Sequence, residues 1–295
     1  MTHQTSTPDS VTSAYDYCVR LAQRHYENFP VASWLLPRRL RKPVAVIYAF
    51  ARTADDFADE GGHDSQWRLS RLENYRTCLQ SLATGLIVDD PIFVALDDCR
   101  RRFDLPLSLF DDLLSAFIQD ISRKHYATTT EVLEYCRYSA NPVGRLLLYL
   151  DQSASPQNLS DSDAICTALQ LINFLQDIGQ DYSENDRIYI PEETMQRYGV
   201  DVSWFAERRT DTPMRELIHD RIDQARTLLF QGAPLAWRLS GRFGLEIRLI
   251  VAGGLCILDK LAQQHGDVFS RPRLDWRDKL RMFKTACSRS CPGQA

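Results

Sequence analysis

The chain has 295 residues, a formal net charge of −4 at pH 7 and a composition that is 44% hydrophobic. That length is ample for a buried core. The slight acidic excess excludes a protein that neutralises nucleic-acid phosphates over a long footprint, so we expect no nucleic-acid partner. The eight cysteines form no CxxC pairs, which is typical of reduced thiols in a cytoplasmic protein.

The polarity of the chain ends and the lengths of the apolar runs predict the domain organisation and the location. Residues 1–10 are polar and lack the apolar core of a signal peptide. The longest uncharged apolar run, at 249–258, is about half of the length that crosses a bilayer. We expect a flexible tail over 1–10, one domain over 11–287 and a second tail over 288–295. The protein is expected in the cytoplasm, at most resting on the inner face of the cytoplasmic membrane.

Apolar residues recur at helical steps along nearly the whole chain, and no strand-like alternation is visible. The expected helices cover 11–27, 44–60, 65–84, 90–103, 107–126, 131–150, 161–182, 213–232, 243–265 and 273–287. The short separators carry Pro, Gly, Asp or Ser, as helix connections do. The pattern predicts an all-α, single-domain helical bundle, with a central cavity built from facing helices.

A basic segment, PRRLRKP at 37–43, precedes the second expected helix. Prolines bracket it, which predicts a loop. Its four cations are Arg38, Arg39, Arg41 and Lys42. A solvated turn is the favoured interpretation, and a peripheral contact with an anionic membrane surface is the alternative.

The expected helix at 44–60 carries the first of two polar stripes. The stripe consists of Tyr48, Arg52, Asp55, Asp56 and Asp59, at three- and four-residue steps within a run of Ala, Val, Ile and Phe. Such a stripe by itself is often only a solvated face, with Arg52 as an internal ion-pair partner of the acids. Glycines at 61 and 62 are expected to end this helix.

The second stripe lies in 168–191 and consists of Gln170, Asn173, Asp177 and Asp181. The other directions of the helix are apolar, which predicts a core helix whose polar stripe faces an interior cavity. Burying carboxylates without a partner is costly, and a divalent cation or a basic group is the usual remedy. Two such acidic helices would hold a cluster of Mg²⁺ ions, which favours a diphosphate substrate.

A third feature is Asn141-Pro142, which interrupts the helical pattern at 131–150. Proline removes a backbone hydrogen bond and kinks a helix. The kink is either architectural or part of a cavity wall, together with Arg137, Tyr138 and Ser139.

Both stripes, in order and spacing, resemble the aspartate-rich motifs of the squalene/phytoene synthase family of isoprenoid diphosphate enzymes. YAFARTADDFAD is similar to the first motif and LQLINFLQDIGQDYSENDRIYIP to the second, and the likeness runs from about residue 15 to 285. It implies an isoprenoid-synthase fold and about three Mg²⁺ ions bound with the diphosphate. The implied Mg²⁺ ligands are Asp55, Asp59, Asn173, Asp177 and Asp181, with Asp56 as an accessory acid.

The same resemblance implies contacts with a small-molecule prenyl diphosphate. Tyr48 and the four metal-binding aspartates are the expected catalytic residues. The expected substrate-binding residues are Asn28, Tyr48, Arg52, Arg137, Tyr138, Asn141, Gln170, Asn173 and Arg187.

Within the family, HYENFPVASWLLP and YCRYSANPVG look most like the bacterial hydroxysqualene synthases (HpnC type). Glu27-Asn28-Phe29 stands where other members have Lys- or Arg-Ser-Phe, and Gln176 stands where Arg usually precedes the second-motif Asp. This loss of basic groups fits an enzyme that starts from one diphosphate. The implied reaction converts presqualene diphosphate to hydroxysqualene by ionisation, rearrangement and water capture, without a nicotinamide, in squalene and hopanoid biosynthesis. Association with the preceding and following pathway enzymes is expected.

Two alternatives remain open. One is a head-to-head prenyl synthase that makes presqualene diphosphate, squalene or phytoene from farnesyl or geranylgeranyl diphosphate. The other is a non-catalytic relative that keeps the fold as a scaffold, although the intact acids in both stripes argue against it.

Overall fold

The computed structural model describes residues 8–24, 36–264, 267–288 and 291. Within these ranges the chain forms fifteen α-helices and one isolated β-bridge, between His125 and Ile188. The all-α prediction is therefore confirmed. The chain divides into two compact units, the first comprising Met1–Ser122 and Pro142–Ser155 and the second Arg123–Asn141 and Pro156–Ala295. The single domain expected over 11–287 stays a prediction.

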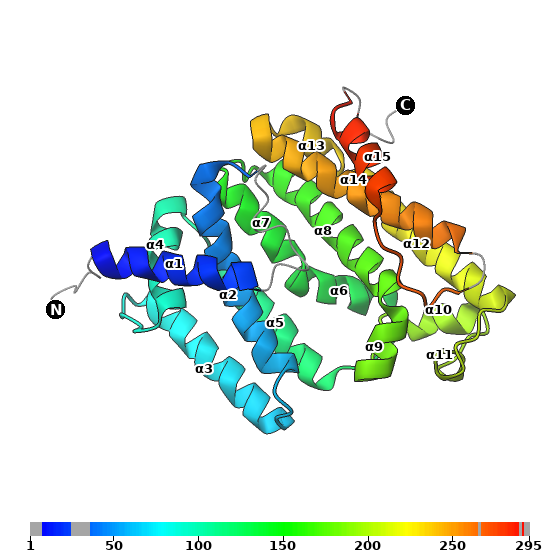
Figure 1. Cartoon of the computed structure of the whole chain (residues 1–295). Helices are drawn as coiled ribbons and strands as arrows, with labels where there is room; N and C mark the ends of the chain where they lie inside the picture. The colour runs from blue at the N-terminus through cyan, green and yellow to red at the C-terminus, as the bar shows by residue number, and fades with distance from the viewer. Residues whose placement is uncertain (1–7, 25–35, 265–266, 289–290, 292–295) are drawn as a thin grey trace. The chain divides into compact units, whose positions relative to one another are not determined.

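The first unit is arranged around helix α2 (Figure 1). Its helices are α1 (Pro8–Arg24), α2 (Arg38–Asp59), α3 (Ser65–Ala83), α4 (Pro91–Phe103), α5 (Leu107–Ser122) and nearly all of α7 (Asn141–Leu150). Helix α2 packs against α1, α3, α4 and α5. The Phe50 ring at its centre lies 4.9 Å from the Tyr75 ring, 5.1 Å from Phe110 and 6.0 Å from Phe93, measured between centroids. One face of α2 thus packs into an aromatic core, and polar side chains occupy its other face.

Local signals set the ends of these helices. The Asp64 side chain accepts a hydrogen bond from the Trp67 N–H at 2.8 Å and so caps α3, and Asp90 caps α4 through Ile92 in the same way. Gly61 and Gly62 have φ of 84° and 61°. These left-handed conformations end α2 where the sequence predicted.

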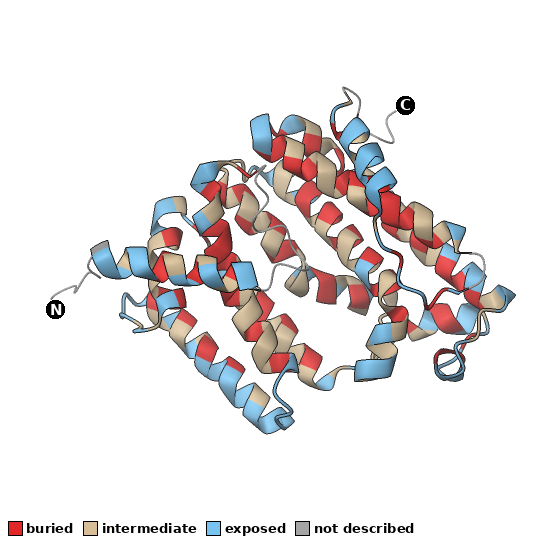
Figure 2. Ribbon diagram, in the orientation of Figure 1, coloured by how far each residue is buried: buried red, intermediate tan, exposed pale blue. Residues whose placement is uncertain are grey.

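The second unit contains α6 (Thr129–Ser139), α8 (Pro156–Gln176), α9 (Ile178–Asn185), α10 (Glu192–Arg197), α11 (Ser203–Ala206), α12 (Thr212–Gly232), α13 (Pro234–Arg238), α14 (Gly241–Gln263) and α15 (Trp276–Ala286). Helix α8 packs against α6, α12 and α14, and α15 packs on α14. The buried residues follow the facing sides of these helices (Figure 2).

Several predicted helix bounds are wrong. The helix expected at 107–126 ends at Ser122, and the one at 131–150 is two helices, with a break at Ala140. Pro142 lies in the first turn of α7, where a helix needs no N–H donor. One helix therefore ends and a second begins here, instead of one helix with a kink. The helix expected at 161–182 is divided at Asp177 into α8 and α9. The short helices α10, α11 and α13 were not predicted, because each contains too few residues for a helical period to be recognised in the sequence.

The basic segment at 37–43 is helical, so the predicted loop is wrong. Pro37 is the N-cap of α2 and Pro43 lies buried within the helix. Pro37 is tolerated because the N–H of an N-cap needs no intrahelical partner, whereas Pro43, in the second turn, leaves one backbone carbonyl of the first turn without its helical hydrogen bond.

Three of the four cations of this segment have contacts within the first unit. Arg39 pairs with Asp151 at 2.7 Å, and Lys42 pairs with Asp16 at 2.8 Å. Arg41 donates to the Leu36 carbonyl oxygen at 3.1 Å. These contacts favour a structural role for the segment.

Other expectations concern the chain ends, the thiols and the membrane. Helix α1 begins at Pro8, inside the expected tail, and residues 1–7 lie outside the described part. All eight cysteines are free, as predicted. None of the described helices is long and apolar enough to cross a membrane.

Candidate functional site

The first polar stripe occupies one face of α2. Tyr48, Arg52 and Asp55 are half-buried and Asp59 is exposed, whereas Phe50 on the opposite side is fully buried. The structure therefore keeps the acids of this stripe partly accessible. Partial exposure avoids the large free-energy cost of desolvating several carboxylates at once.

Arg52 is the ion-pair partner of the acids around it. Its guanidinium lies 3.1 Å from an Asp55 oxygen and 2.7 Å from an Asp56 oxygen, and it also pairs with Glu60. The internal ion pairing considered from sequence is therefore confirmed. A single guanidinium is thus shared among three carboxylates, those of Asp55, Asp56 and Glu60.

Burial and the neighbouring charges change the pKa values of side chains in the first stripe. Burial, followed by the negative charge of Asp59, raises the pKa of Asp55 to about 6. Burial also raises the pKa of Tyr48. A carboxyl group whose charge is disfavoured in this way would gain from a bound cation, because opposite charge restores its ionised form.

The second stripe crosses the junction between α8 and α9. The Asp177 N–H donates to the Asn173 carbonyl oxygen at 2.9 Å, and the Asp181 N–H donates to the Asp177 carbonyl oxygen at 2.8 Å. Because these i→i−4 bonds continue across the break, Asn173, Asp177 and Asp181 still share one face. Asn173 is exposed, and Gln170, Asp177 and Asp181 are half-buried, so the stripe is partly accessible, and its orientation toward an interior cavity stays a prediction.

Arg271 is a partner that the sequence did not reveal. Its Nε lies 2.6 Å from an Asp177 oxygen. It belongs to a segment without helical period, remote in sequence from the stripe, and only its charge could have drawn attention to it. The ion pair places a cation directly at the expected metal ligand.

The segment that carries Arg271 is packed against the helix junction. The Gln176 amide donates to the Pro272 carbonyl oxygen at 3.0 Å. A Cβ added to Gly179 would lie 2.8 Å from the Phe269 carbonyl oxygen. Glycine at 179 therefore permits the close approach that holds Arg271 in place.

The acids of the second stripe also have perturbed pKa values. Burial and the charge of Asp177 raise the pKa of Asp181 to about 7, although Arg187 opposes the shift. Burial raises the pKa of Asp177 despite Arg271. Arg187 is half-buried, and its N–H donates to the Asp181 carbonyl oxygen at 3.1 Å. It therefore lies beside the stripe, and its role in substrate binding stays a prediction.

An aromatic cluster borders the second stripe. Phe174, adjacent to Asn173, stacks on Tyr189 with ring centroids 3.7 Å apart, and Tyr126 and Tyr135 complete the cluster. Tyr189 is held by an extended segment, whose Ile188 N–H donates to the Lys124 carbonyl oxygen at 3.0 Å. These tyrosines escaped the sequence reasoning because they come from separate segments.

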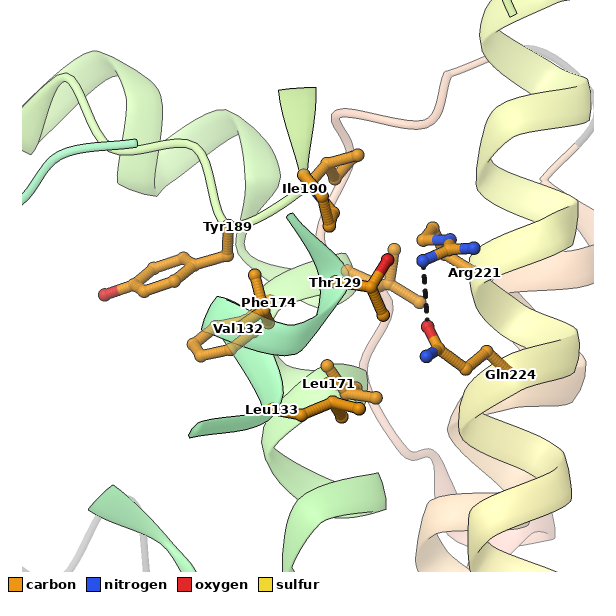
Figure 3. Close-up of a pocket in the computed structure, with 11 residues that line it drawn as sticks. Thr129, Val132, Leu133, Leu171, Phe174, Tyr189, Ile190, Arg221 and Gln224 are labelled. Atoms are coloured by element: carbon orange, nitrogen blue, oxygen red, sulfur yellow. Dashed lines mark hydrogen bonds between the residues drawn. The ribbon is translucent and has the colours of Figure 1, made fainter. Parts of the chain in front are cut away.

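The pocket behind this cluster is narrow and apolar (Figure 3). Phe174 and Tyr189 line one side, and the Arg221 guanidinium, which donates to the Gln224 amide oxygen at 2.9 Å, lies on another. Its volume of about 20 Å³ suffices for roughly one water molecule. It is far too small for a prenyl chain.

The residues near the predicted kink lie in α6 and at the start of α7. Asn141 is buried, and its amide oxygen accepts a hydrogen bond from the Thr167 hydroxyl at 3.0 Å. Arg137 is exposed with its guanidinium 5.0 Å from the centre of the Tyr138 ring. The side-chain amide of Asn141 thus has a structural role, since it joins the start of α7 to α8. Asn28 lies outside the described residues.

The donor chemistry of both stripes fits Mg²⁺. Carboxylate and amide oxygens are its usual protein ligands, and the ion commonly binds through one or two carboxylates together with water and substrate phosphates. Among the described residues, no three His, Cys, Asp or Glu side chains already gather in a metal-binding geometry.

Comparison with known proteins gives the family. Residues 22–281 match the squalene/phytoene synthase family. The hydroxysqualene synthase of Rhodopseudomonas palustris is 35% identical over 77% of this chain and 76% of its own length, and that of Zymomonas mobilis is 36% identical over 76% and 75%.

Solved structures agree with this match. Squalene synthase HpnC from Alicyclobacillus acidocaldarius has a TM-score of 0.82 at 34% identity, covering 88% of this chain and 97% of its own. A dehydrosqualene synthase in complex with a ligand has a TM-score of 0.80 at 25% identity, covering 94% and 96%. The fold is thus of the isoprenoid-synthase type. The chain therefore belongs to the squalene/phytoene synthase family of enzymes, which act on small-molecule prenyl diphosphates.

Proposed function

We propose that this enzyme converts presqualene diphosphate to hydroxysqualene in a Mg²⁺-dependent reaction. The observation that carries the proposal is the similarity to two hydroxysqualene synthases over about three quarters of each chain. The activity belongs to squalene and hopanoid biosynthesis, and association with the enzymes that supply the diphosphate and consume the alcohol is part of the proposal.

The two acidic stripes carry the metal requirement. The residues that would hold the ions, about three in number, are Asp55, Asp59, Asn173, Asp177 and Asp181. When bound, Mg²⁺ supplies Lewis-acid neutralisation of the departing diphosphate. The raised pKa values of Asp55 and Asp181 support this role, because both carboxyl groups gain from nearby positive charge.

Three arginines can bind phosphate oxygens. Arg52 and Arg271 hold expected metal ligands in ion pairs, and Arg187 lies beside Asp181. With these carboxylates engaged as metal ligands, the guanidinium groups would be free to donate hydrogen bonds to the diphosphate. The protein's own cations thereby orient the leaving group.

The remaining chemistry requires water at one point only. The carbon–oxygen bond to diphosphate breaks, the cyclopropylcarbinyl cation opens, and the oxygen of one water forms the new carbon–oxygen bond while its proton leaves to solvent or diphosphate. The overall conversion involves no net oxidation or reduction, so no nicotinamide is needed. Tyr48, Tyr138 and Ser139 are the polar side chains proposed to position that water, and apolar surroundings must exclude the rest.

Head-to-head condensation of two prenyl diphosphates is the second candidate. Phytoene synthase of Mycobacterium tuberculosis is 30% identical over 64% of this chain. The geometry around Gln176 weighs against condensation, because its amide is bonded to the Pro272 carbonyl oxygen instead of offering positive charge to a second diphosphate. The scaffold alternative has no comparable support, because both acidic stripes are intact.

The deciding experiment is product analysis of purified protein with Mg²⁺ and presqualene diphosphate in ¹⁸O-labelled water. We expect hydroxysqualene that carries the label, in an amount unchanged by NADPH. A parallel reaction with farnesyl diphosphate should give little presqualene diphosphate. Squalene formed only with NADPH, or efficient condensation of farnesyl diphosphate, would overturn the proposed reaction.

A further inference from the structure

The C-terminal helix α15 presents large apolar side chains to solvent. Trp276 is 66% exposed, Leu280 63% and Phe283 57%. Their spacing of four and three residues puts them on one side of the helix, one above the other. Figure 2 shows this helix as mostly exposed along its length. Exposing one apolar residue is ordinary, whereas three in a continuous stripe call for an explanation.

The orientation of this stripe is held firmly by the opposite side of α15. Asp278 is buried, and accepts contacts from Lys260 at 2.8 Å and from Arg281 at 2.5 Å. Asp278 also forms a capping box with Asp275. Met282 packs against Gly253 of α14, which has space for its thioether. The helix cannot roll to bury its apolar stripe without breaking these contacts.

Cations border the stripe on both sides. Arg277 and Lys284 lie along one edge and Lys279 along the other, as the helical repeat requires, and all three are exposed. The acid within the helix, Asp278, is buried and paired. In a chain whose net charge is −4, this helix is a local concentration of positive charge.

The chemistry of the stripe identifies its partner. Three side chains on a short helix offer far less area than a stable protein dimer buries, which is about 800 Å² on each side. Aromatic and aliphatic side chains flanked by Lys and Arg are the pattern of a helix that lies in the interface of a membrane. Trp in particular favours the level of the lipid headgroups.

We propose that α15 is an in-plane membrane anchor, which inserts Trp276, Leu280 and Phe283 into the surface of a bilayer and pairs its flanking cations with anionic phospholipid headgroups. The inference rests on the surface of α15 and not on the proposed reaction. It is also distinct from the basic start of α2, where Arg39 pairs with Asp151 and Lys42 with Asp16. A prenyl substrate that dissolves in membranes would give such an anchor an obvious use.

The test is flotation of the full-length protein with vesicles of phosphatidylcholine alone or mixed with phosphatidylglycerol. We expect the wild type to float with the mixed vesicles. The triple variant W276Q/L280Q/F283Q should bind them at least about tenfold more weakly, because the buried apolar area is lost. The variant R277Q/K279Q/K284Q should lose roughly fivefold for each cation removed, and only with the anionic vesicles.

The matched control is L86Q/I87Q, which removes two other exposed apolar side chains, Leu86 and Ile87. It should float like the wild type. Circular dichroism and turnover of detergent-dispersed presqualene diphosphate would show that the α15 variants stay folded, whatever product the enzyme makes. Failure of the wild type to float, equal flotation of the triple apolar variant, or self-association that the triple variant abolishes without any lipid binding would each overturn the proposal.

Discussion

Asp177 has an ion-pair partner at the position where a metal ion is proposed to bind. In the protein alone its carboxylate is held by Arg271, 2.6 Å away. With a metal ion held by the same oxygen, the Arg271 guanidinium would be available to an anion. Arg52 stands in the same relation to Asp55 and Asp56. In each stripe, an arginine thus supplies positive charge beside a carboxylate that is proposed to bind the metal.

The first residue-scale prediction concerns the metal ligands. Asp59→Asn and Asp177→Asn should each lower turnover by a factor on the order of 10² or more, since each removes a charged oxygen ligand that neutralises the leaving group. The fold should persist because neither side chain is in a core. Turnover with saturating Mg²⁺ and circular dichroism are the measurements. Glu134→Gln, on the exposed side of α6, is the control that should keep full activity. Near-normal turnover in either aspartate variant would remove that residue from the metal site.

The second concerns Arg271. Arg271→Ala should weaken substrate binding and turnover, because a phosphate-binding cation is lost, while Mg²⁺ binding without substrate stays equal or tightens, because Asp177 loses its competitor. Isothermal titration with Mg²⁺ and steady-state kinetics separate the two effects. Arg273→Ala removes a nearby exposed charge and should change neither. Weaker Mg²⁺ binding in Arg271→Ala would mean that Arg271 organises Asp177 instead of competing for it.

At the scale of elements, close helix packing depends on particular glycines. A Cβ at Gly232 would lie 2.4 Å from the Asp161 carbonyl oxygen and 2.7 Å from Ile165 Cγ1, so α12 meets α8 where a methyl group has no space. At Gly253, the nearest atom is the flexible end of Met282, 3.2 Å away. The two helical glycines therefore differ sharply in what they tolerate.

We accordingly expect Gly232→Ala to destabilise the protein by about 1–3 kcal/mol, the usual cost of overpacking. Gly253→Ala should be neutral or stabilising by up to about 1 kcal/mol, because alanine favours a helix. Chemical denaturation of both variants against the wild type checks this. Equal losses would show that the contact between α8 and α12 adjusts easily.

The attachment of α15 to α14 predicts a pH dependence. Hydrogen bonds from Lys260, the Asp275 N–H and Arg281 hold the pKa of Asp278 well below its usual range. A carboxyl group with a lowered folded-state pKa stabilises the fold above its unfolded pKa of about 3.9, and that contribution is lost as the pH falls through the folded-state value. Asp278→Asn should therefore lower Tm near neutral pH, and the gap to the wild type should narrow below about pH 4. Thermal melts across this range test it, and a gap that does not change with pH would contradict it.

At the scale of the whole molecule, stability and metal dependence should separate. Each unit has its own apolar core, the ring cluster around Phe50 in the first and the packing of α8, α12 and α14 in the second. The acidic stripes lie outside these cores. Chelation should thus abolish turnover while leaving the helical circular dichroism spectrum unchanged, and added Mg²⁺ should restore the rate. A fully active metal-free enzyme would point to catalysis by a protein acid.

Much of the fold could be predicted because helices and their faces are local. The periodic pattern located the long helices, and the two stripes appeared at the correct steps, since three- and four-residue spacing is a property of any helix. The division at Asp177, the restart at Asn141 and the helical character of 37–43 were missed. At each of these places proline or polar residues are compatible with either outcome, and packing makes the choice.

The sequence by itself determined the helical class, the two acidic stripes and, through its motifs, the family resemblance. Tertiary structure decided how those side chains are partnered and how far they are exposed. It paired Asp177 with Arg271, tied Asn141 to Thr167, and left the apolar stripe of α15 in solvent. The physical reason is that hydrogen bonds, ion pairs and burial depend on which remote segments meet, and a local period carries no information about a distant partner.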